Sequence, residues 1–133
     1  MEIPEIDDSI PEIIANDFRE AFLCYSVEAY NACAVMCRRA IETIALDKKA
    51  KGNYLYEKIK NLEHQGLHPT LIELATEIRM LGNVPAAHPD VTSSLRRVTR
   101  EECEYLLDFL SECLNSIYVR PLRIRNLQNR RNN

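Results

Sequence analysis

The apolar residues of this chain recur at intervals of three and four positions, which is the period of an amphipathic helix. The sequence has no stretch in which apolar and polar residues alternate as they do in a half-buried strand. The pattern therefore predicts an all-α fold, an antiparallel bundle of about five helices. The expected helices cover residues 9–25, 27–48, 53–66, 70–81 and 99–121.

Capping residues set the expected helix ends. A Ser or Thr followed three positions later by Glu predicts a capping box, in which each residue satisfies the other's backbone N–H group. We expect Asn53 to cap the short third helix, Gly66 to close it and Pro121 to end the last helix. The predicted boxes pair Ser9 with Glu12, Thr70 with Glu73 and Thr99 with Glu102.

The end of the fourth expected helix carries a candidate site. Gly82 predicts a left-handed helix end, which can bring Arg79, Asn83 and His88 close together. A permanent cation, an amide and a group that titrates near neutrality can together bind and react with a phosphate. In the structural alternative, Arg79 pairs with a carboxylate, Asn83 supports the helix cap and His88 lies in a polar loop.

Three more arginines, Arg96, Arg97 and Arg100, gather at the start of the fifth expected helix. The helix macrodipole disfavours cations there by a few tenths of a kcal/mol each. A bound anion would offset that cost, because helix N-termini bind phosphate readily. Alternatively, long exposed arginine side chains tolerate this position at little cost.

The second expected helix carries a further polar group. Arg38 and Glu42 are spaced for an ion pair within the helix. Arg39 points about 100° away, where it can meet the fourth helix or a partner. If Glu42 reaches Arg79 instead, that arginine is structural.

The length of 133 residues fits one domain, and the net charge of −3 gives no global indication of nucleic-acid binding. The charges are nevertheless unevenly distributed, since residues 1–12 carry acids and no base whereas the last fifteen residues carry arginines and no acid. A basic end can bind nucleic acid, contact the acidic end of a neighbouring subunit or remain a solvated tail. We expect an acidic arm over 1–8, a helical domain over 9–121 and a weakly packed tail over 122–133.

Four of the five cysteines, Cys33, Cys37, Cys103 and Cys113, lie at helical core spacing and are typical of buried thiols in a reducing cytosol. The sequence indicates neither a metal site nor a cofactor. It also shows no secretory signal and no apolar run of the roughly 18 residues that a membrane span needs.

Two sequence pieces carry a resemblance. Met36-Cys-Arg-Arg-Ala-Ile-Glu42 and the stretch from Arg79 to His88, together with the final amphipathic helix, resemble the bacterial and phage "domain of unknown function 4145" family. That family is grouped with the HEPN superfamily of small helical bundles. The resemblance covers roughly residues 21–123.

The resemblance implies a bundle that often dimerises in prokaryotic restriction, toxin–antitoxin or anti-phage systems. It also implies cleavage of RNA without metal by an arginine and a histidine, for which Arg79 and His88 are the matching residues. This chain departs from the pattern at Met80, which follows the arginine directly, and in its longer spacing. The sequence therefore leaves two functions open, an RNA- or nucleotide-binding module that can cleave RNA, and a non-catalytic adaptor that assembles a larger complex.

Self-association is expected from an aromatic pair. Tyr105 and Phe109 lie one turn apart on the fifth expected helix, beside its main apolar stripe. Aromatic side chains left on a helix flank favour an interface. We therefore predict a homodimer.

Overall fold

The computed structural model describes residues 3–74 and 97–132, and every regular element within these ranges is helical. This confirms the predicted all-α bundle. Residues 69–74 form the start of the expected fourth helix, whose remainder lies outside the described residues. The named elements are α1 (Glu12–Ser26), α2 (Tyr30–Asp47), α3 (Leu55–Asn61), the 3₁₀ turn η1 (Leu62–Gln65), α5 (Arg100–Leu114), the π-helical turn η3 (Asn115–Val119) and α6 (Arg120–Asn132).

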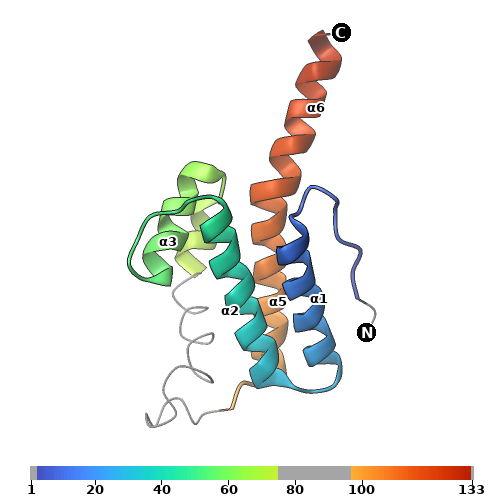
Figure 1. The fold of residues 1–133 in the computed structure, drawn as a ribbon, viewed down its shortest axis with the longest axis vertical. Coiled ribbons are helices and arrows are strands. Elements are labelled where there is room, and N and C mark those ends of the chain that lie inside the picture. The colour runs from blue at the N-terminus through green and yellow to red at the C-terminus, as the bar shows by residue number, and fades with distance from the viewer. Residues whose placement is uncertain (1–2, 75–96, 133) are drawn as a thin grey trace.

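Helices α1, α2 and α5 contact one another and enclose the core (Figure 1). Helix α1 runs antiparallel to the other two, while α3 and η1 pack beside α2 (Figure 1). The core side chains come from the apolar stripes of these elements, as the helical period predicts. Fully buried members include Ile14, Ile41, Ile44, Ile59, Leu62, Leu106, Leu110 and Leu114.

Helices α1 and α2 and the turn η1 end in the same way. In each, a residue with positive φ follows the last turn: Glu28 at 63°, Lys49 at 54° and Gly66 at 108°. The next residue donates its N–H group to a carbonyl five positions back, as Ala29 does to Cys24 at 2.8 Å and Ala50 to Ala45 at 2.8 Å. This is the Schellman arrangement, which favours glycine at the left-handed position. Gly66 was predicted to close its helix. Glu28 and Lys49 also adopt the left-handed conformation, which is less favourable for a residue with a Cβ atom than for glycine.

The predicted capping boxes differ in outcome. The Thr99 box is confirmed: Thr99 Oγ1 accepts from the Glu102 N–H group at 3.1 Å, and Glu102 Oε1 accepts from the Thr99 N–H group at 2.9 Å. The Ser9 box is wrong, because α1 begins at Glu12 with Pro11 as its N-cap and without a side-chain cap.

The predicted Asn53 cap is also wrong. Tyr54 is the N-cap residue of α3, and no side chain caps this helix. The backbone N–H group of Asn53 instead donates to Glu57 Oε2 at 3.0 Å.

Pro121 does not end the last helix, contrary to the sequence-based expectation. The chain passes from α5 through η3 into α6 as one continuous rod (Figure 1). In η3 the N–H group of Arg120 donates five positions back, to Asn115 O. Pro121 is the second residue of α6, where its fixed φ suits a helix and its missing N–H group falls in the first turn.

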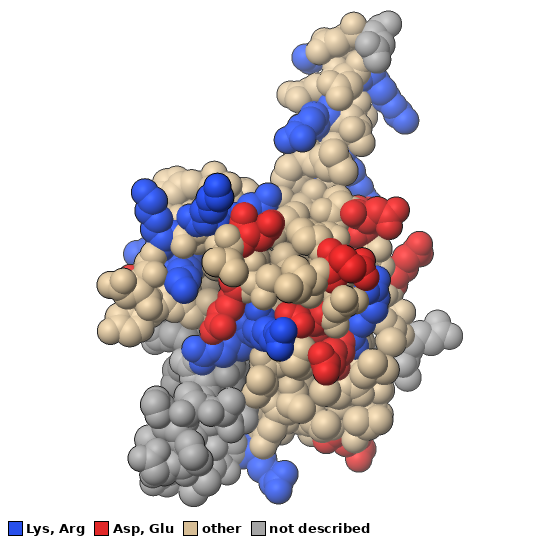
Figure 2. Space-filling view, in the orientation of Figure 1, with Lys and Arg blue, Asp and Glu red and all other residues tan. Residues whose placement is uncertain are grey.

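Residues 122–132, expected to be a weakly packed tail, are therefore helical. No side chain of α6 is buried, and the helix projects beyond the bundle (Figure 1). Its charged residues are all arginines (Figure 2).

The aromatic pair on α5 is not exposed as expected. Phe109 is buried in the core at 4 % exposure, and Tyr105 is half-buried against it. The two side chains therefore do not form the flank on which the homodimer was predicted.

Candidate functional site

Four predicted site residues, Arg79, Asn83, His88 and Arg96, lie outside the described residues. The described chain resumes at Arg97, which is exposed, and Val98, which is buried. The Val98 N–H group donates to Asn31 Oδ1 of α2 at 2.8 Å. Together with the Thr99 capping box, this bond fixes where the chain joins α5.

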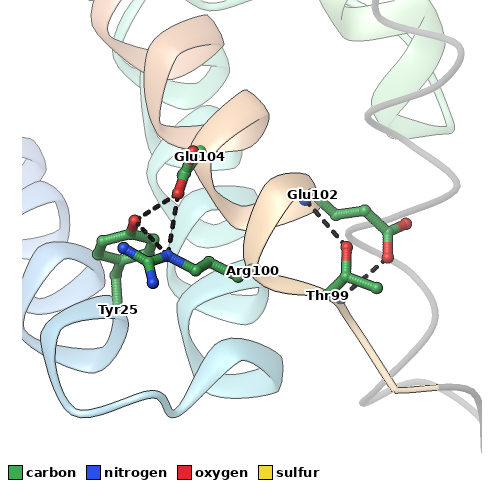
Figure 3. Close-up of polar contacts among 5 residues, drawn as sticks. All are labelled: Tyr25, Thr99, Arg100, Glu102 and Glu104. Carbon is green, nitrogen blue, oxygen red and sulfur yellow. Dashed lines mark hydrogen bonds and ion pairs between the residues drawn. The ribbon is translucent and has the colours of Figure 1, made fainter.

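A polar cluster of Tyr25, Arg100 and Glu104 lies at this end of the bundle (Figure 3). The Tyr25 hydroxyl donates to Glu104 Oε1 at 2.6 Å. Arg100 Nε lies 3.2 Å from both the Tyr25 hydroxyl and Glu104 Oε1. Two helices distant in sequence, α1 and α5, are thus joined by one acid, one base and one phenol.

Hydrogen bonding sets the protonation of this cluster. The bond from Tyr25 lowers the pKa of Glu104, and Arg100 lowers it further. The same bond to Glu104 raises the pKa of Tyr25. The cluster is therefore a neutral phenol bound to a carboxylate and a guanidinium at neutral pH.

A shallow pocket of about 360 Å³ adjoins the cluster. Its lining combines the apolar Phe22 and Leu107 with the cluster residues and Asp108. The guanidinium of Arg100 is held through Nε, and its two terminal nitrogens make no hydrogen bond to the described residues. Because a guanidinium can bind an anion through those terminal nitrogens, Arg100 combines a fixed position with a free binding edge.

The polar residues of α2 are placed differently. Arg38 Nε pairs with Glu42 Oε1 at 2.9 Å, which confirms the predicted ion pair. Arg39 lies against α1, where its Nε is 3.4 Å from Asp17 Oδ2. We expected Arg39 to meet the fourth helix or a partner. Among the described residues it instead pairs with the Asp17 carboxylate of α1. Arg39 thus pairs with Asp17 across the α1–α2 contact, although Asp17 Oδ2 accepts no hydrogen bond from the described residues.

The predicted core thiols are buried: Cys33, Cys37, Cys103 and Cys113. Cys103 donates through sulfur to the Tyr30 carbonyl at 3.2 Å. Burial raises the pKa of the Cys113 thiol, which makes it a poor nucleophile. Within residues 3–74 and 97–132, no three His, Cys, Asp or Glu side chains are grouped to hold a metal ion.

The sequence identified Arg100 but not Tyr25 or Glu104 as members of this cluster. The i,i+4 spacing of Arg100 and Glu104 was visible in the sequence. The phenol comes from a helix 75 positions away from Arg100, so no local pattern indicates it.

The fold defines the chain as an all-α bundle, and the described helices include none that is long and apolar enough to cross a membrane. Residues 19–130 match the family "Domain of unknown function (DUF4145)". Because the match spans most of the chain, the protein belongs to this family. No curated protein and no solved structure matches the chain.

Proposed function

We propose that this chain is a HEPN-like module that binds the phosphates of RNA or of a nucleotide beside the N-terminus of α5. The observation that supports this most directly is the presence of two exposed arginines, Arg97 and Arg100, at the start of α5. Arg97 is exposed, and Arg100 is held at Nε with 60 % of its side chain exposed. Guanidinium groups bind phosphate oxygens well, so the proposal rests on these arginines; the Thr99 box already occupies the Thr99 and Glu102 N–H groups.

The proposed site includes the loop that precedes α5. Arg96 is adjacent in sequence to Arg97. Asn83 and His88 are expected in the same loop, and Arg79 is expected on the last turn of the fourth helix just before it. In RNA cleavage by the 2′-hydroxyl, Arg79 would stabilise charge on the phosphorane and His88 would transfer a proton. A homodimer would bring a second histidine for the other proton transfer. No step in this scheme needs a metal.

The basic helix α6 belongs to a different surface. Arg100 and Arg130 lie on one continuous rod, so the helical rise separates them by about 45 Å. One nucleotide cannot contact both. We therefore propose the start of α5 as the phosphate site, and nucleic-acid binding by the tail stays a separate prediction.

The proposed setting is the cytoplasm of a prokaryote, within a restriction, toxin–antitoxin or anti-phage system. This setting is taken from the resemblance of the sequence to the family. The five thiols are free, as expected in a reducing compartment.

A second candidate function is that of a non-catalytic adaptor. Helix α6 favours it, because Leu122, Ile124 and Leu127 are exposed on a helix without buried residues. Such a helix can dock on a partner protein.

The experiment is incubation of the purified protein with labelled RNA in chelator, with a parallel mononucleotide-binding arm. We expect Arg79→Ala and His88→Ala to retain the melting temperature and lose RNA cleavage or phosphate binding. Arg38→Ala is the matched control, since it removes a partly buried arginine of α2 that pairs with Glu42. Intact RNA with equal binding by all four proteins would contradict the proposal and favour the adaptor.

A further inference from the structure

Helix α6 has the composition of a segment that needs a partner. Its thirteen residues include Pro121 and three asparagines, which are poor helix formers, and none of its side chains is buried. It is the projecting end of the continuous α5–η3–α6 rod. The exposed apolar pair Ile124 and Leu127 lies one turn apart, at 49 % and 62 % exposure. A partner that covers this pair would stabilise α6.

The charge of α6 defines the chemistry of that partner. Arginines precede and follow the apolar pair in the sequence, and α6 contains no acid. The projecting helix carries basic side chains in Figure 2. The required surface is therefore apolar at its centre and acidic at its rim. The arginines are Arg120, Arg123, Arg125, Arg130 and Arg131.

The protein itself carries a surface of this kind. A groove of about 480 Å³ lies between the N-terminal arm, α1 and the α5–η3–α6 rod, and we call it the arm groove. Its apolar lining includes Ile6, Phe18 and Val119. Its carboxylates are Glu5, Asp7, Asp8 and Glu112.

The arm groove reaches the base of α6, since Arg123 lines it as well. Glu112 precedes Arg130 by eighteen residues on a continuous rod, which corresponds to about 27 Å. Two copies that align their α6 helices antiparallel can therefore place each basic tip on the other's acidic groove. Both contacts form together, as a two-fold axis requires.

We propose that α6 docks on the arm groove of a second copy of this chain, reciprocally across a two-fold axis. Ile124 and Leu127 pack at the centre, and Arg130 and Arg131 face Glu5, Asp8 and Glu112 of the other copy. The inference rests on the homodimer of the proposed function, and it names the surface through which the two copies would contact each other. It does not depend on RNA binding.

The test is a charge exchange followed by analytical ultracentrifugation at tens of micromolar. We expect a homodimer for the wild type. Arg130→Glu/Arg131→Glu places acids on the acidic groove, and Glu5→Lys/Asp8→Lys places bases against the basic tip. Each variant alone should weaken the homodimer by at least about tenfold, because like charges then meet at both contacts.

Mixing the two variants should restore a dimer, because the reversed tip of one copy then meets the reversed arm positions of the other, and the unchanged tip meets the unchanged groove. Glu112 is the same in both variants. Lys51→Glu/Lys60→Glu, a matched charge reversal at two exposed positions, should dimerise like the wild type. A wild-type dimer that tolerates the arginine reversal, or a mixture that stays monomeric, would overturn this surface and leave the proposed homodimer standing. A monomeric wild type would overturn both, and RNA capture by α6 of that monomer would identify nucleic acid as the occupant.

Discussion

Arg39 Nε lies 3.4 Å from Asp17 Oδ2 across the contact between α1 and α2. The carboxyl side chain is 7 % exposed, whereas the arginine side chain is 63 % exposed. Asp17 is therefore a buried acid whose ion-pair partner reaches it from solvent. This asymmetry makes the arginine important to stability even though it lies at the surface.

Arg39→Ala should lower the free energy of unfolding by about 1–2 kcal/mol, because it leaves the Asp17 carboxylate buried without its cation. Solvent around the exposed guanidinium keeps the loss below that of a fully buried pair. Arg38→Ala, on the neighbouring residue, should cost no more than about 0.5 kcal/mol. Urea unfolding of both variants measures the difference, and equal losses would contradict the structural role of Arg39.

Thr99→Ala should destabilise the protein by about 1 kcal/mol, since it removes the side-chain cap of α5. Ser9→Ala is its matched control. The Ser9 hydroxyl is buried without a hydrogen-bond partner among the described residues, so its removal should be neutral or slightly stabilising. Thermal melts compare the two changes, and a larger loss for Ser9→Ala would contradict the assigned caps.

The Tyr25 hydroxyl should control the acidity of Glu104. Tyr25→Phe removes the main hydrogen bond that lowers the Glu104 pKa, so that pKa should rise toward its ordinary value. A depressed carboxyl pKa gives stability above the unfolded-state pKa of about 4.3, and this stability is lost as pH falls through the folded value. The Tyr25→Phe protein should therefore lose less stability on acidification below that point. NMR titration of the Glu104 carboxyl gives the pKa directly, and an unchanged value would count against this bond.

Lys49→Gly should stabilise the protein by roughly 0.5–1 kcal/mol, because glycine adopts the left-handed conformation of Lys49 without a Cβ penalty. Lys51→Gly is the control, because Lys51 is a nearby exposed lysine whose φ is not positive. It should be neutral or slightly destabilising through the entropy of the unfolded chain. Chemical unfolding measures the free energy of unfolding of both variants. A loss of stability in Lys49→Gly would contradict the strain assigned to this turn.

The sequence predicted those features that depend on neighbouring residues. The Thr99 capping box and the Arg38–Glu42 pair were correct because each is complete within one helical turn. The Ser9 box failed because a competing local bond exists: Asp7 Oδ1 accepts from the Ser9 N–H group at 2.9 Å. Such a turn offers the backbone an alternative to the helix start.

Features that join distant segments could not be predicted in this way. The bonds from Tyr25 to Glu104 and from Tyr118 to Asp47 span more than seventy positions each. Pro121 misled for a different reason: it lies just after the π-helical η3, and the rod continues through it into α6. The candidate loop from Arg79 to His88 stays a prediction.

The central claim is that phosphate binds at the start of α5, and the salt dependence of RNA binding tests it most directly. Fluorescence anisotropy with single-stranded RNA should be repeated over a series of salt concentrations for the wild type and for Arg97→Glu/Arg100→Glu. Each lost phosphate contact reduces the slope of log K against log salt by about 0.7, so the variant should bind more weakly with a slope smaller by about 1.4. Lys51→Glu/Lys60→Glu should keep both values. An unchanged affinity and slope in the Arg97→Glu/Arg100→Glu protein would contradict the claim.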